Sequence, residues 1–232
     1  GLALGLSNNA TLNGTGAGSL SNPVGQTLTL TSATIGATVP LDNQGLLLLH
    51  NSSAVNGALT TGPSSTLRVE AVGGQFNTFA TVANGFTNNG LIELTSISGA
   101  LTASLTVPAG TLTNASTGVI NVVANTGGGR TLAAQLDNQG QLTVGQALTL
   151  GRSSAVLSNS GTLDVSGGDL TISQSGTTPS FTNTGTLTVG PGRTLTINNG
   201  AFTQQTGATL NGGGTLTLNA VTTVFSTGFT LG

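Results

Sequence analysis

The sequence predicts an all-β protein, a parallel β-solenoid of about nine to ten coils with no substantial helix. Three observations lead to this fold class. One short phrase, an aliphatic or Phe residue followed by Asn, then Gly, then alternating Leu or Val, recurs along the chain. Its copies are nearly evenly spaced, and the runs between them alternate with a period of two residues, as strands do. No segment shows a convincing helical period.

The repeated phrase sets the length of each coil. Its clear copies are LDNQGLLLL from residue 41, FTNNGLIEL from 86, LTNASTGVINV from 112, LDNQGQLTV from 136, LSNSGTLDV from 157 and FTNTGTLTV from 181. A degenerate copy, FTQQTGATL, starts at 202, so the starts from 86 onward differ by 26, 24, 21, 24 and 21 residues. The step of 45 from 41 to 86 is about two coils, and the weak copy LTTGPSSTLRV from 59 fills it.

A second alternating run lies between successive copies. These runs are ALTL at 147–150, DLTI at 169–172, TLTI at 194–197 and TLTL at 215–218. Short alternating runs bounded by Gly, Asn, Pro and Ser are typical of strands joined by turns. We therefore expect each repeat of 21 to 26 residues to form one coil that stacks on the next. An immunoglobulin-like sandwich is the alternative, but the recurrence of one phrase once per repeat favours the solenoid.

The Asn of the phrase is predicted to form a column. In a parallel solenoid the same position of successive coils stacks vertically, and amide side chains in such a column hydrogen-bond to one another or to the backbone. The predicted structural ladder at the corner consists of Asn43, Asn88, Asn114, Asn138, Asn159 and Asn183.

The chain divides into an irregular N-terminal segment, residues 1–40, and a solenoid, residues 41–232. Alternation after the corner places Leu46, Leu48, Leu91 and Val119 on the outer face, where an apolar stripe needs a cover. We expect the N-terminal segment to be a covering or assembly strand, and a neighbouring subunit is the alternative cover. The sequence shows no obvious cap, so Phe225 and Phe229 are candidates for an end-to-end joint.

Composition excludes several functions. Charged residues make up 4% of the chain, against about 25% in a typical soluble domain, and Lys, Cys, Met, Trp and Tyr are absent. A net charge of −2 gives no basic face for nucleic acid, and the lack of Cys excludes disulfides and thiolate metal sites. No apolar run is long enough for a membrane-spanning helix, so we expect no membrane insertion by this segment. The start at Gly1 indicates a processed or excised chain.

The few charged residues do not form a catalytic pattern in the sequence. Asp164 and Asp169 come closest to a pair of glycosidase carboxylates, and His50 is the single histidine. We expect no enzyme activity, no cofactor and no metal. A polysaccharide-cleaving enzyme, the third alternative, would be favoured if three or more of the charged residues met in one groove.

The N-x-G-x-L-x-V coils, spread over residues 41–218, resemble the passenger and stalk regions of bacterial surface adhesins, that is, haemagglutinin-like and autotransporter-like β-solenoids. The resemblance implies an extracellular location at the cell surface and a structural role as a fibre or filament subunit or an adhesin stalk. Its partners would then be further copies of the chain, or the rest of a longer surface protein.

The alternative is a module that binds ice or a glycan on a Thr-rich solenoid face. Thr pairs at 186/188, 194/196 and 215/217 favour it. The matching column after the corner is interrupted, however, by Glu93, Asn121, Gln141 and Asp164, whereas an ice-matching array needs several uninterrupted rungs.

Overall fold

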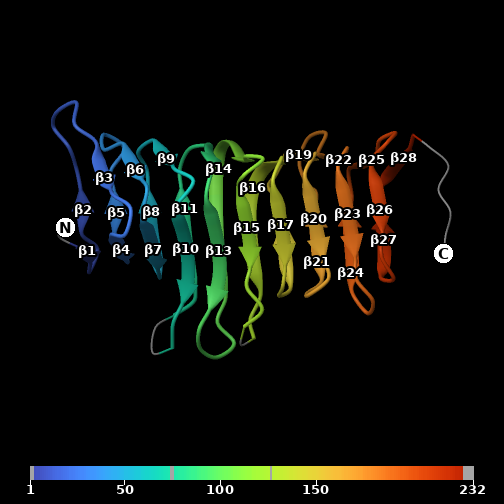
Figure 1. The fold of residues 1–232 in the computed structure, drawn as a ribbon, viewed down its shortest axis with the longest axis horizontal. Coiled ribbons are helices and arrows are strands. Elements are labelled where there is room, and N and C mark those ends of the chain that lie inside the picture. The colour runs from blue at the N-terminus through green and yellow to red at the C-terminus, as the bar shows by residue number, and fades with distance from the viewer. Residues whose placement is uncertain (1–2, 74–75, 126, 227–232) are drawn as a thin grey trace.

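The computed structural model shows a parallel β-solenoid of ten coils. It describes residues 3–73, 76–125 and 127–226, and across these ranges every regular element is a strand. The coils follow one another along the long axis of the molecule, so the first and last coils lie at opposite ends of a rod (Figure 1). The predicted fold class is confirmed, including the number of coils.

Each coil has three walls. Wall 1 is a ten-stranded parallel sheet: β1 (Leu4–Ser7), β4 (Thr27–Thr31), β7 (Leu46–His50), β10 (Thr66–Ala71), β13 (Leu91–Ser96), β15 (Val119–Val122), β17 (Gln141–Val144), β20 (Thr162–Val165), β23 (Thr186–Val189) and β26 (Thr209–Asn211). Wall 2 contains β2 (Thr11–Leu12), β5 (Thr34–Ile35), β8 (Ser52–Val55), β11 (Thr78–Val82), β14 (Ala103–Asn114), β16 (Arg130–Asn138), β18 (Leu148–Leu150), β21 (Leu170–Ser173), β24 (Thr194–Asn198) and β27 (Thr215–Asn219).

Wall 3 is made by the repeated phrase itself. Its strands are β3 (Leu20–Asn22), β6 (Leu41–Asn43), β9 (Leu59–Thr61), β12 (Phe86–Asn88), β19 (Val156–Asn159), β22 (Ser180–Asn183), β25 (Ala201–Gln204) and β28 (Thr222–Phe225). In the fifth and sixth coils, β14 and β16 run on from wall 2 into wall 3 and supply its strands there. The phrase, or a degenerate segment in its place such as Leu59–Thr61, therefore forms a third strand in addition to the two alternating runs.

Alternation along each strand separates the core from the surface. In β7, Leu47 and Leu49 are fully buried whereas Leu46 and Leu48 are partly exposed. Parallel pairing keeps this register from coil to coil, so that Leu47 stacks on Leu67, and the buried aliphatic residues of all coils form one continuous core. Burial of this apolar column is the main driving force for folding.

Glycine at the corner lets the coils approach closely. The Gly of the phrase lies just before wall 1, where the backbone of one coil touches the backbone of the coil before it. A Cβ atom on Gly161 would lie 2.1 Å from the carbonyl oxygen of Gly140, closer than atoms can approach. The phrase requires Gly here because no larger residue fits between two stacked corners.

The N-terminal segment corrects one expectation. Described residues within 1–40 do not cover the outer face; they form the first coil and much of the second, with β1 paired to β4, β2 to β5 and β3 to β6. The reason is visible in the residues, because Thr27–Thr31 alternates as a wall 1 strand and Leu20–Asn22 is another copy of the Leu-x-Asn phrase. The solenoid begins before residue 41.

Two irregularities interrupt the regular coils. The connection from β13 to β14 and the described part of that from β15 to β16 extend beyond most of the other connections on one side of the rod (Figure 1). Where β14 enters wall 3, it bulges between Thr106 and Thr111. The pairing register shows the bulge, because Thr106 and Thr111 pair with Ala133 and Gln135, which lie much closer together along the straighter β16. Both irregularities lie in the middle of the rod.

Candidate functional site

The corner Asn residues lie in one buried column at the end of wall 3. Their side-chain amides are linked head to tail, with Nδ2 of one residue donating to Oδ1 of the next. The distances are 2.8 Å for Asn88 to Asn114, and 2.7 Å each for Asn114 to Asn138, Asn138 to Asn159 and Asn159 to Asn183. The amides also donate to backbone carbonyls of the wall 1 strand that follows the next Asn of the column, as Asn138 does to Thr162 of β20 at 3.0 Å.

The column extends beyond the six residues that the sequence predicted. Asn22 donates to Asn43 at 2.7 Å, and the amide of Gln204 accepts from Asn183 at 2.9 Å. At the coil between Asn43 and Asn88 the position is Thr61, whose hydroxyl donates to the carbonyl of Thr87 at 2.9 Å. The signals for these members were the LSN, FTQQ and LTT segments, in which the phrase is degenerate.

The apolar stripe on wall 1 is partly exposed. Leu46, Leu91 and Val119 occupy one outward column with Thr66 between the two Leu residues, and Leu48 stacks on Arg68 in the next column. The N-terminal segment does not cover this stripe, since it forms coils of the same wall.

A network of charged side chains adjoins the stripe. His50 Nε2 lies 3.1 Å from Glu70 Oε1, and Arg68 contacts Glu93 Oε2 through Nη2 at 2.7 Å and Nε at 2.7 Å. Arg68 Nη1 is also 4.0 Å from Glu70 Oε2. The structure thus brings together three charged residues and the histidine, which the sequence had left isolated. The two carboxylates are engaged with cationic or imidazole partners, an arrangement typical of a stabilising network on an outer wall.

Among the described residues, Asp137 and Asp169 have local partners, whereas Asp164 Oδ1 is buried without a hydrogen-bond partner. Asp164 lies in β20 on wall 1, whereas Asp169 precedes β21 on wall 2 and accepts the Thr194 amide at 2.9 Å. Asp137 accepts from Ser158 and from Gln139, each at 2.6 Å. The proposed Asp164 and Asp169 pair therefore belongs to two different walls.

The end coils leave core positions exposed. Leu4 of β1 and Leu218 of β27 both point inward in the register of their neighbours, yet they are 37% and 36% exposed. Phe225 lies edge-on to Phe202 at 6.0 Å, continuing a stack of rings inside wall 3. Phe229, the other candidate for a joint, is outside the described residues.

Wall 2 carries an uninterrupted outward column of hydroxyl groups. Six successive coils place Ser or Thr at the same position: Ser104, Thr131, Thr149, Thr171, Thr196 and Thr217. The column after the corner, on wall 1, is interrupted, whereas Thr196 and Thr217 from the Thr pairs at 194/196 and 215/217 belong to this column on wall 2. The signal for the wall 2 column is the Thr that recurs at the same position of the second alternating run in successive repeats.

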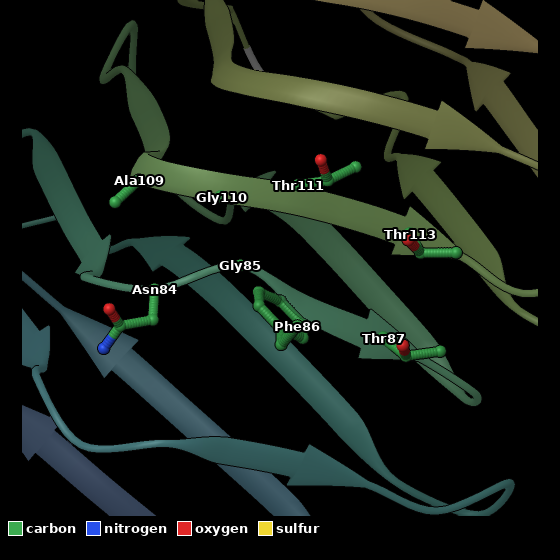
Figure 2. A pocket seen from close by; sticks show the side chains of 8 residues that line it. All are labelled: Asn84, Gly85, Phe86, Thr87, Ala109, Gly110, Thr111 and Thr113. Atoms are coloured by element: carbon green, nitrogen blue, oxygen red, sulfur yellow. The ribbon is translucent and has the colours of Figure 1, made fainter.

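A groove of about 400 Å³ opens on wall 3 between β12 and the bulge of β14 (Figure 2). The lining residues are Asn84, Gly85, Phe86, Thr87, Ala109, Gly110, Thr111 and Thr113. Arg152 anchors the bulge from two coils away, because its Nη1 donates to the carbonyls of Val107 at 2.9 Å and Gly110 at 3.1 Å. No sequence pattern pointed to this groove.

Arg130 is a buried cation under the extended connections. Its side chain points into the solenoid, and Nη1 donates to the carbonyl of Gly128 at 2.9 Å and lies within 3.4 Å of three other carbonyl oxygens, those of Leu101, Gly127 and Gly129. Among the residues that the structure describes, Nε and Nη2 find no hydrogen-bond partner. Burial lowers the pKa of the guanidinium from its usual range.

Over the described ranges, no three His, Asp or Glu side chains are grouped as metal ligands, and no helix is long and apolar enough to span a membrane. The described part of the molecule presents a hydrogen-bonded corner column, an ion-pair network, a hydroxyl column and a groove lined by both polar and apolar groups. Comparison with protein-family models, curated proteins and solved structures finds no match to this chain.

Proposed function

We propose that this protein is a structural rod of an extracellular fibre or adhesin stalk, extended by coils that stack on its ends. The observation that carries the proposal is the continuity of the solenoid: ten coils pair in parallel through wall 1, one core runs along nearly the whole length, and an amide column interrupted at Thr61 runs beside it. Such a rod resists bending and local opening because each interior coil is hydrogen-bonded to the coil before it and to the coil after it.

The exposed core positions support stacking at the ends. Leu4 and Leu218 occupy places that are fully buried in interior coils, so a further coil placed against either end would bury them. Strand edges at the described ends also offer backbone groups that pair readily with another strand. The low charge of the chain offers little repulsion to oppose this contact.

Negative-stain electron microscopy over a range of concentrations tests the proposal. We expect unbranched rods that lengthen with concentration, and we expect Leu218→Lys to shorten them because a charge at the end face opposes burial. Val156→Lys is the matched control, since Val156 is 53% exposed but lies on the outer side of wall 3 in the middle of the rod. Rods of one fixed length at all concentrations would contradict end stacking.

Lateral association through wall 1 gives a different result. If the apolar stripe mediates contact between rods, Leu46→Ser combined with Leu48→Ser reduces bundling while rod length stays unchanged. The two sets of variants therefore separate end-to-end from side-by-side assembly.

A second function, ice binding on wall 2, is favoured by the hydroxyl column from Ser104 to Thr217. Thermal hysteresis and ice shaping by the purified protein test it. We expect Thr171→Lys, in the middle of the column, to abolish any such activity and Thr182→Lys, on wall 3, to preserve it. Absence of both signals from the unaltered protein would reject ice binding.

A further inference from the structure

The groove on wall 3 is built by a mismatch between neighbouring coils. After β11 the chain reaches β12 through residues 83–85, whereas the next coil bulges outward through residues 107–110 within β14. The two segments meet where Gly85 lies against Thr111, so closely that a Cβ on Gly85 would be 2.4 Å from the Thr111 nitrogen. The bulge forms one side of the groove and Asn84 marks the other (Figure 2).

Hydrogen bonds within the protein fix the shape of the groove without a ligand. Arg152 ties the bulge to the rod through the carbonyls of Val107 and Gly110. Asn84 Nδ2 donates to the carbonyl of Asn56 in the preceding coil at 3.2 Å. A site with fixed walls binds with a smaller loss of conformational entropy than a flexible loop does.

The polar groups in the groove are neutral. Thr87 and Thr113 occupy neighbouring rungs of one outward column, and across the described residues neither hydroxyl has a side-chain hydrogen bond. The hydroxyl of Thr111 accepts from Gln135 at 2.9 Å, which leaves its own proton available. Ala109 and the edge of Phe86 add a small apolar surface. The next rung of the column beyond Thr113 is Asp137, a hydrogen-bond acceptor.

Hydroxyl, amide and carboxylate groups beside a small apolar surface match the chemistry of a sugar ring. Each sugar hydroxyl both donates and accepts, as the Thr hydroxyls do, while the C–H faces pack against methyl groups and aromatic edges. An anionic ligand fits poorly, because the carboxylate of Asp137 lies beside the groove and Arg152 already donates to the bulge. The volume of about 400 Å³ falls in the range of small-ligand sites.

We propose that the groove between β12 and the β14 bulge binds a neutral glycan, with one or two sugar rings against Thr87, Thr111 and Thr113. This inference rests on the groove alone and does not depend on how the rods assemble. On a long rod, such a groove would be a defined point of attachment to a polysaccharide surface.

The test uses the whole chain and defined probes. Malto-, manno-, galacto-, xylo- and N-acetylglucosamine oligosaccharides are titrated by saturation-transfer-difference NMR, and a glycan array adds sialylated and sulfated members. We expect at least one neutral series to bind and the Thr87→Val/Thr113→Val variant to lose about tenfold in affinity, because two sugar hydrogen bonds are lost.

Thr182→Val is the matched control, since Thr182 lies in the same outward column outside the groove. Val is close to Thr in volume, and circular dichroism checks that each variant keeps its fold. Three outcomes would overturn the proposal: no neutral oligosaccharide binds, binding is unchanged in the Thr87→Val/Thr113→Val variant, or only charged glycans bind.

Discussion

The corner Asn residues show why an amide, and no other side chain, suits this position. An amide carries a donor and an acceptor without charge, so identical residues stack in a chain in which each Nδ2 reaches the next Oδ1. Thr61 breaks the chain, because its hydroxyl bonds to a backbone carbonyl and passes no hydrogen bond to Asn88. Gln204 continues it, since its amide accepts from Asn183.

Asn138→Ala should lower the free energy of unfolding by about 2–4 kcal/mol. The change removes two donated hydrogen bonds, to Asn159 and to the carbonyl of Thr162, and the one accepted from Asn114, and it leaves the Asn159 side-chain oxygen buried without that donor. Urea unfolding followed by circular dichroism measures the loss. Asn121→Ala on the outer face of wall 1 is the control and should change stability by less than about 1 kcal/mol. Equal effects at both positions would show that the column adds no stability.

At the scale of strands and connections, the sequence predicts the repeated strands and corners but few of the irregular features. Period-two alternation was enough to place Leu47 inside and Leu46 outside, and the Asn-x-Gly phrase placed the corners. The sequence did not predict the coils before residue 41, because Asn22 is followed by Pro and Val before Gly25, whereas most of the clear copies have Gly two residues after Asn. The bulge at 107–110 gave no signal, since its Val, Pro, Ala and Gly also occur in ordinary turns.

The extended connections depend on Arg130. Nη1 donates to backbone carbonyls in two of these connections, which stabilises them. Nε and Nη2 are buried without a partner among the described residues, and their desolvation destabilises the folded state. We expect Arg130→Met to change global stability in urea by less than about 1 kcal/mol, because these two effects offset each other. Proteinase K should nevertheless cut the variant faster near residues 97–102 and 127–129.

Arg193→Met is the control for this effect. Arg193 lies at the turn before β24, away from these connections, so cleavage near them should stay at the unaltered rate. Mass spectrometry of the fragments locates the cuts. An Arg130→Met variant with unchanged cleavage would mean that the connections keep their shape without the guanidinium.

At the scale of the whole rod, stability is shared between neighbouring coils. Interior coils are hydrogen-bonded on both sides through three walls, except that wall 3 has no strand pairing between β9 and β12, so opening one coil requires loss of pairing to two others. Local opening should therefore be costly in the middle of the molecule and easier at the first and last coils. A protease that needs an extended, unpaired segment reports this property directly.

Trypsin should cut the folded rod on the order of a hundredfold more slowly than the urea-unfolded chain, because its four Arg sites are tied to neighbouring coils. Arg68 and Arg130 lie within strands, and the carbonyl of Arg193 accepts the Thr215 amide at 2.9 Å. The bond after Arg152 is the weakest point, since Ser153 is exposed in a turn and the Arg152 carbonyl bonds only locally, to Ala155. Timed digestion with mass spectrometry should therefore show Arg152 cut first. Early cleavage at Arg68 or Arg130 would mean that interior coils open independently of their neighbours. That result would contradict the proposal of a rigid structural rod.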